Sequence, residues 1–150
     1  MSLIRITKCF EFEAGHALYG YDGKCKNIHG HSYKLCVTVA GSPIEDINHP
    51  KNGMVIDFGD LKKIVNKYIV DVYDHATIFN LKSPHSQIGQ LLQDQGMKIV
   101  FHDFQPTCEN VIVYFSNVLK EHLPDYVDLV TLKLQETSGS FVEWHASDNS

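Results

Sequence analysis

Apolar and polar residues alternate along the first regular segment of the chain, residues 3–14. The apolar residues that share one face are Ile4, Ile6, Phe10 and Phe12. A period of two is typical of a strand that buries one face. If this phase continues through Gly15, His16 leaves the strand on its buried side.

The same alternation returns over residues 31–40 and predicts a second strand. Its apolar face carries Tyr33, Leu35, Val37 and Val39. His29 and His31 are in phase with these residues, and side chains two positions apart in a strand point the same way. A loop over residues 17–27, with an Asp22-Gly23 turn, joins the two strands. Both strands are therefore expected to place histidines at the end of the buried face.

The clearest helical pattern follows Asp57, which has the features of an N-cap, with Asp60 in the first turn. The apolar residues at helical spacing are Leu61, Ile64, Val65, Tyr68, Ile69 and Val72. They form one apolar face, which is typical of an amphipathic helix packed on a core. We expect this helix to end near Asp74-His75.

The last third of the chain predicts one helix and two strands. The helix begins after Thr107 as N-cap, carries Glu109 in its first turn and ends before Pro124. Alternating residues over 126–136 and 141–145 predict the strands, which a turn at Ser138-Gly139 joins.

Residues 80–105 have the least regular pattern, with a possible short helix over 88–93 and a short strand over 97–101. Leaving this segment aside, the order is two strands, two helices, two strands. That order predicts a single α+β domain over residues 1–150, with a four-stranded antiparallel sheet and two helices on one face. Such a small sheet has exposed edges, so we expect several copies to close into a ring.

Composition narrows the class of protein. The net charge is −5 and the apolar content 43%, which is ordinary for a globular domain. No apolar run is long enough to cross a bilayer, so no membrane partner is expected. The basic residues are scattered, which argues against nucleic-acid binding. Four cysteines without a secretion signal do not suggest a disulfide framework, and the cytoplasm is the expected location.

One short stretch combines residue types that bind metals. Cys25 precedes His29 and His31, and His16 lies upstream. A lone histidine is more often a surface or core residue, but three imidazoles with an open fourth position are the donor set of a catalytic zinc. Cys25 either fills the fourth position, as in a structural site, or stands beside the ion as a reactive thiol. The spacing leaves both open.

Five motifs in register resemble one known family. They are His16…Cys25-x-x-x-His29-Gly-His31, the stretch Asn52–Asp60, Asp74-His75 followed by Asn80, Pro106-Thr-x-Glu109-Asn110, and Glu136-Thr137. Together they resemble the 6-pyruvoyl-tetrahydropterin synthase and 6-carboxytetrahydropterin synthase family.

The resemblance implies a T-fold, in which sheets of several subunits join into a barrel, commonly as a hexamer of two stacked trimers. It implies a small-molecule substrate, 7,8-dihydroneopterin triphosphate, and Zn²⁺ as the cofactor. By the resemblance, the zinc ligands are His16, His29 and His31; the catalytic thiol is Cys25, supported by Asp74 and His75 across a subunit interface; and Glu136 holds the pterin ring, with Thr107 and Glu109 near the same pocket.

The residues outside the metal pattern also have simpler explanations. Asp74-His75 suits the C-terminal end of a helix, where the dipole favours a histidine. Glu136 can be a carboxylate at the rim of the sheet, and Thr107 is more often a cap than a ligand. Acidic residues such as Glu109 are favoured in a first turn in any helix.

Within this family we favour the 6-carboxy synthase, which also expels acetaldehyde on the route to 7-deazaguanine compounds such as queuosine. The alternative is the 6-pyruvoyl synthase of tetrahydrobiopterin synthesis. A third reading, from another class, is a non-catalytic module in which Cys25 and the three histidines form a closed structural zinc site.

Overall fold

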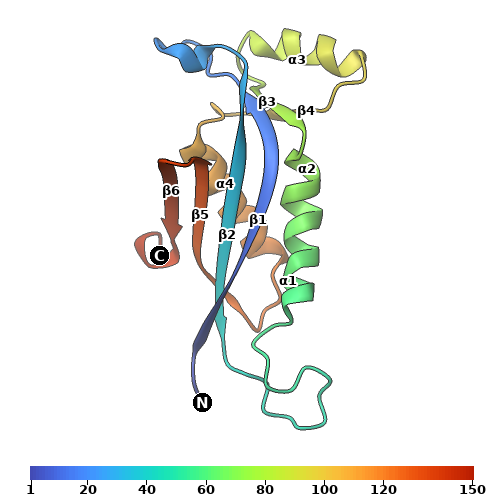
Figure 1. Ribbon diagram of the computed structural model, residues 1–150, viewed down its shortest axis with the longest axis vertical. Coiled ribbons are helices and arrows are strands. Elements are labelled where there is room, and N and C mark those ends of the chain that lie inside the picture. The colour runs from blue at the N-terminus through green and yellow to red at the C-terminus, as the bar shows by residue number, and fades with distance from the viewer.

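The computed structural model describes residues 1–150 as a sheet with helices packed on one of its faces (Figure 1). The sheet has six strands in the order β4-β3-β1-β2-β5-β6. The strands are β1 Ile4–His16, β2 His29–Gly41, β3 Ala76–Asn80, β4 Ile99–His102, β5 Asp128–Thr137 and β6 Ser140–His145. The helices are α1 Phe58–Val65, α2 Asp71–Tyr73, α3 His85–Asp94 and α4 Cys108–His122, with short 3₁₀ turns at Lys24–Lys26 and Ala146–Asp148.

The two long central strands, β1 and β2, confirm the alternation read from the sequence. They pair antiparallel in one unbroken register that runs from Ile4 opposite Gly41 to His16 opposite His29. In the middle of both strands, from Phe10 to Ala14 and from Tyr33 to Val39, the inward residues are buried and the outward residues are exposed or half-buried. The phase does continue through Gly15, since His16 is only 2% exposed.

The helical layer also begins where the sequence predicts. The Asp57 side chain accepts a hydrogen bond from the Gly59 N–H at 2.7 Å and caps α1. A π-helical turn, Asn66–Val70, joins α1 to α2, so that the three segments form one rod beside the sheet (Figure 1). Thr107 caps α4 by accepting a hydrogen bond from the Asn110 N–H at 3.2 Å. The apolar faces of this rod and of α4 close the core against the sheet.

The predicted sheet of four antiparallel strands is wrong in its number and partly in its direction. Two further strands extend the sheet beyond β1: β3 pairs with β1, β4 pairs with β3, and both pairings are parallel. β3 has five residues and β4 four, which is too short for an alternating pattern to emerge. Their places in the sheet come from pairing with strands distant in the sequence, which no local pattern can reveal.

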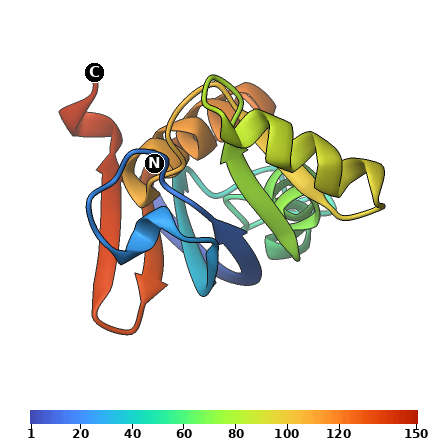
Figure 2. The same ribbon diagram turned by 90° about the horizontal axis from the view of Figure 1, so that it is seen from above.

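The irregular segment over residues 80–105 contains a third helical segment and the outer strand. The short helix and short strand suggested there are confirmed in type, as α3 and β4. α3 lies beside β3 and β4 at the end of the sheet where β1 finishes (Figure 2). Gly89 allows this close packing, because a Cβ there would lie 2.5 Å from the ring of Phe101.

The cysteine pattern gave an expectation that the structure corrects. Cys9 and Cys36 face one another across β1 and β2 and form a disulfide, whereas Cys25 and Cys108 are free. Counting cysteines cannot anticipate this pair, because only the register of the two strands brings them opposite. None of the helices combines the length and the hydropathy that crossing a bilayer would require.

Phe115 of α4 is the clearest test of this core. Its side chain is fully buried and packs edge-on against Phe12 and Tyr73. We expect Phe115→Ala to lower the free energy of unfolding by about 3–5 kcal/mol, because it removes apolar contacts and leaves a cavity. Urea denaturation followed by circular dichroism measures the change. The control is Val113→Ala on the same helix, where the side chain is 49% exposed; equal losses in both variants would contradict the packing described.

Candidate functional site

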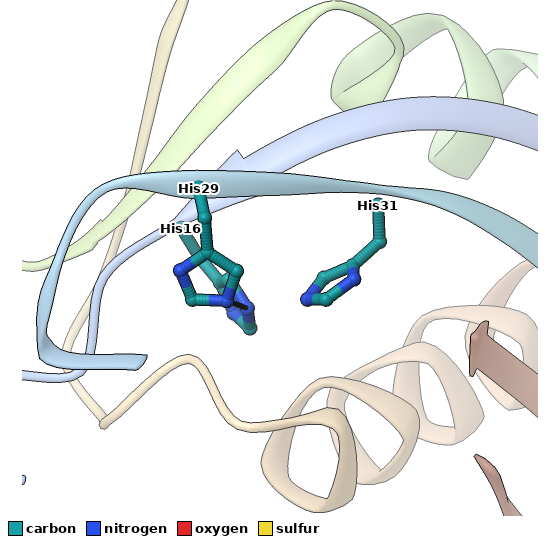
Figure 3. A group of neighbouring side chains, drawn as sticks. All are labelled: His16, His29 and His31. Atoms are coloured by element: carbon teal, nitrogen blue, oxygen red, sulfur yellow. Dashed lines mark hydrogen bonds between the residues drawn. The ribbon is translucent and has the colours of Figure 1, made fainter. Parts of the chain in front are cut away.

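Three histidines converge at the end of the helix-covered face of the sheet (Figure 3). His16 ends β1 and lies opposite His29, the first residue of β2, while His31 lies opposite Ala14. One ring nitrogen of each histidine lies within 4.8 Å of the others. We call His16, His29 and His31 the three-histidine cluster. The unbroken strand register alone is sufficient to bring these side chains to one face.

Backbone carbonyls fix the orientation of two of the rings. His16 Nδ1 lies 2.7 Å from the carbonyl of Pro106, and His29 Nδ1 lies 2.7 Å from the carbonyl of Asn27. A carbonyl can only accept, so we assign the proton to Nδ1 in both rings. Each Nε2 then carries a free lone pair, although these two atoms are only 3.1 Å apart.

That arrangement fits a bound cation. Two unprotonated nitrogens at this distance repel unless a positive ion lies between them. Tetrahedral zinc with Zn–N bonds of about 2.0–2.1 Å holds its ligand nitrogens about 3.3 Å apart. The spacing of the His16 and His29 Nε2 atoms is close to that value.

His31 supplies the third nitrogen. Its Nε2 is buried and has no hydrogen-bond partner, although Glu136 Oε1 lies 3.4 Å away. A buried polar atom without a partner is costly, and metal coordination would satisfy it. Burial lowers the pKa of both His16 and His31, against the opposing effect of the Glu136 charge. The neutral imidazole is the form that binds metals, and burial favours this neutral form of both side chains.

Cys25 lies in the 3₁₀ turn Lys24–Lys26 of the loop between β1 and β2. Its thiol is free, and its sulfur is not part of the three-histidine cluster. The loop closes on itself, since the Leu18 N–H donates to the Cys25 carbonyl at 2.9 Å. It is also tied to the start of α4, because the Gln105 side-chain amide donates to the Tyr19 carbonyl at 2.9 Å.

Asp74 and His75 form a pair directly before β3. Asp74 Oδ2 lies 3.1 Å from His75 Nδ1, and Asp74 Oδ1 accepts a hydrogen bond from the Glu13 N–H at 2.9 Å. That backbone hydrogen bond, more than the neighbouring His75 and Lys98, lowers the pKa of the Asp74 carboxyl. The pair therefore has an ionised acceptor next to an imidazole, which is suited to proton transfer.

The pair does not reach the three-histidine cluster of its own chain. The side chain of His75 is 78% exposed. It opens into a groove of about 330 Å³ whose lining includes Glu13, Ser32 and Thr77 and, from the cluster, His31. Neither Asp74 nor His75 is among the groups that converge in the cluster, although the groove reaches His31.

Glu136 occupies an irregular position in β5, between Gln135 and Thr137, where the pairing with β6 shifts. With His31 it lines a groove of about 550 Å³ that contains no hydrophobic residue. Thr107 and Glu109 do not line that groove. The Thr107 hydroxyl caps α4, and Glu109 is exposed in the first turn. The structure therefore brings Glu136 to the cluster and leaves Thr107 and Glu109 in the helix-start roles that the simpler reading gave them.

Comparison with known proteins matches this arrangement to one family. The model of the family described as 6-pyruvoyl tetrahydropterin synthase matches residues 5–147. The chain belongs to this family.

Two relatives illustrate the range of the family. The chain is 40% identical to the 6-carboxy-5,6,7,8-tetrahydropterin synthase of Haemophilus influenzae, over 95% of this chain and 99% of that protein. It is 32% identical to the human 6-pyruvoyl tetrahydrobiopterin synthase, over 92% of this chain and 88% of that protein. Both are lyases, so this chain is an enzyme of a lyase family.

Solved structures support the fold. The 6-pyruvoyl tetrahydropterin synthase of Caenorhabditis elegans aligns with a TM-score of 0.67 at 24% identity, over 97% of each chain. The corresponding enzyme of Plasmodium vivax aligns with a TM-score of 0.72 at 17% identity, over 97% of this chain and 98% of that one. The curled sheet with helices on one face is therefore the T-fold of this family.

Sequence reasoning missed the groups that hold the site together in this tetrahydropterin synthase homologue. Two are the main-chain carbonyls of Asn27 and Pro106, which fix the rings of His29 and His16. The third is the Gln105 side chain, which ties the Cys25 loop to the start of α4. A carbonyl is present at every position, so residue identity carries no signal for the first two. The proximity of Gln105 to the Pro106 motif was the one available clue.

Metal content tests the cluster directly. We expect about one zinc per wild-type chain after dialysis against a chelator. In His16→Ala, His29→Ala and His31→Ala we expect zinc to bind at least about tenfold more weakly, because a site with only three protein ligands loses much of its affinity with any one of them. Elemental analysis by mass spectrometry measures this. His49 is exposed and outside the cluster, so His49→Ala is the matched control. Full zinc retention in all three ligand variants would refute the site.

Proposed function

We propose that this protein is a zinc-dependent 6-carboxytetrahydropterin synthase. It would convert 7,8-dihydroneopterin triphosphate to 6-carboxy-5,6,7,8-tetrahydropterin with loss of triphosphate and acetaldehyde, on the route to 7-deazaguanine compounds such as queuosine. The observation that carries this choice is the 40% identity to a protein of that name along nearly the whole of both chains. The identity to the human 6-pyruvoyl enzyme is lower, at 32%.

The three-histidine cluster is the proposed zinc site, with His16, His29 and His31 as ligands. Zinc bound there would act as a Lewis acid on the side-chain hydroxyls of the substrate and acidify the adjacent carbon-bound proton. The His16 and His29 rings are held by carbonyls, so their nitrogens are oriented before any ion arrives. The donor set of three imidazoles with an open position favours zinc over oxygen-seeking ions.

Cys25 is the proposed general base. Its thiolate would remove the carbon-bound proton of the substrate side chain. Two contacts support this role: the Leu18–Cys25 backbone hydrogen bond closes the loop on itself, and the Gln105–Tyr19 hydrogen bond ties it to the start of α4. A sulfur outside the cluster is free to exchange protons, which a metal-bound sulfur is not.

Asp74 and His75 are the proposed proton relay to the reduced ring. Asp74 Oδ2 accepts from His75 Nδ1, which leaves His75 Nε2 to give and receive the proton. Because the pair is not part of the cluster of its own chain, we propose that it serves the site of a neighbouring subunit. A hexamer of two stacked trimers, with sheets joined into a barrel, provides such contacts.

Glu136 is the proposed anchor of the pterin ring. A carboxylate facing the guanidine-like edge of a pterin forms a paired, charge-assisted contact. The groove beside Glu136 and His31 supports this position, because a ring bound there would lie next to the cluster. Thr107 and Glu109 do not line this groove, so we propose no contact with the ring for them.

Product analysis separates the two chemistries of the family. We expect the zinc-loaded enzyme to release triphosphate and acetaldehyde in equal amounts from 7,8-dihydroneopterin triphosphate, because loss of the two-carbon fragment distinguishes the 6-carboxy product. An alcohol dehydrogenase assay measures acetaldehyde, and chromatography identifies the pterin. Triphosphate release with no acetaldehyde would instead assign the 6-pyruvoyl activity.

The Cys25→Ala variant separates a catalytic thiol from a structural zinc ligand. We expect kcat to fall about a hundredfold or more, since the general base is lost, while zinc content and the urea midpoint stay at wild-type values. Elemental analysis and steady-state assays on one preparation provide both readings. Cys108→Ala is the control, because that thiol is buried against β5 and lies outside the cluster. Loss of zinc from Cys25→Ala would favour the non-catalytic module.

A further inference from the structure

Lys98 connects the irregular segment of the chain to the Asp74-His75 pair. It lies between Gly96, which has a positive φ of 89°, and the first residue of β4. Its ammonium group donates to the carbonyl of Asp71 at 2.7 Å and to the carbonyl of Asp74 at 2.8 Å. Its own carbonyl accepts from the Thr77 N–H at 3.0 Å. The Lys98 side chain thus contacts the chain before His75, and the Lys98 main chain contacts the strand that follows it.

Asp71 is the first residue of the three-residue α2 and Asp74 is its C-cap, so both carbonyls lie at the C-terminal end of the rod formed by α1, the π-helical turn and α2. The last carbonyls of a helix have no partner within the helix, and a cation there also interacts favourably with the helix dipole. The Asp74 carbonyl has a further significance, because it belongs to the peptide that joins Asp74 to His75. A donor on that oxygen fixes the plane of the peptide and, with it, the direction in which His75 leaves the chain.

That peptide needs such support. His75 has a φ of 63°, and it is the one residue other than glycine with a positive φ. This conformation is disfavoured for a residue with a Cβ and persists where surrounding contacts hold it. The contacts are few: the His75 N–H donates to the Glu13 carbonyl at 2.6 Å, the Glu13 N–H donates to Asp74, and Lys98 donates to the Asp74 carbonyl.

We propose that Lys98 is a positioning residue for the Asp74-His75 pair, and that the segment from α3 to β4 has the function of delivering it. The proposal rests on the proton-relay role given to the pair under the proposed function. Lys98 does not touch the substrate. It holds the Asp74–His75 peptide in the orientation in which Asp74 Oδ2 accepts a hydrogen bond from His75 Nδ1.

The test compares kcat and KM of zinc-loaded variants with 7,8-dihydroneopterin triphosphate as substrate. We expect Lys98→Met to lower kcat by about tenfold or more, with KM changed less than about threefold and zinc content unchanged, because displacement of a relay group affects the chemical step more than binding. We expect Lys98→Arg, which keeps a cationic donor, to recover most of that loss. Lys82 lies in the same segment and makes only an exposed ion pair with Asp103 at 3.8 Å, so Lys82→Met is the matched control.

A double variant distinguishes positioning from a general loss of stability. If Lys98 acts through Asp74, adding Lys98→Met to Asp74→Asn should lower kcat no further than Asp74→Asn alone. The proposal would be overturned if the double variant lost kcat by the product of the two single losses. A normal kcat in Lys98→Met, or a Lys98→Arg variant as slow as Lys98→Met, would overturn it as well. Lys98→Gln, which keeps one donor, is made in parallel, and activities are referred to folded protein measured by circular dichroism.

His75→Ala separates this proposal from the proposed function beneath it. A slow His75→Ala together with a normal Lys98→Met would remove only the role of Lys98. A normal kcat in His75→Ala would remove the proton-relay role as well, and with it the reason for positioning the pair.

Discussion

The pairing of β1 with β2 is the constraint on which the rest of the site depends. Thirteen residues of each strand pair without a slip, and the pairing ends where His16 meets His29. A slip of one residue would turn every side chain of one strand to the other face. The buried stripe of β2 would then face solvent, so the burial of the core is also what fixes the three imidazoles on one face. The same hydrogen-bonded ladder thus sets the burial of the core and the arrangement of the three imidazoles.

The start of α4 adds the second layer of order. The Pro106 carbonyl accepts a hydrogen bond from His16. The Gln105 side-chain amide donates to the loop that carries Cys25, and Thr107 caps the helix. Three successive residues thus contact one imidazole of the three-histidine cluster, the loop that carries Cys25 and the end of a helix. Their close spacing keeps the proposed base and the proposed ligand in a fixed relation without a direct contact between them.

The sequence predicted what periodicity and caps control. Alternation located β1 and β2 and put His16 on the buried side, and Asp57 and Thr107 marked the helix starts correctly. It did not predict β3, and it suggested β4 only as an isolated short strand outside the sheet, since strands of five and four residues carry no usable period. Nor did it predict the cross-strand bond between Cys9 and Cys36, which depends on register. The candidate residues of the site were visible as residue types, whereas the carbonyls that orient them were not.

The position of the Asp74-His75 pair outside the three-histidine cluster has a consequence for assembly. If the proposed exchange of the pair between subunits is head-to-tail, each protomer gives the pair to one neighbour and receives it from another. In an open chain of such contacts the last protomer always lacks a donor. Only a closed ring then completes every site, so full activity would require the ring to close.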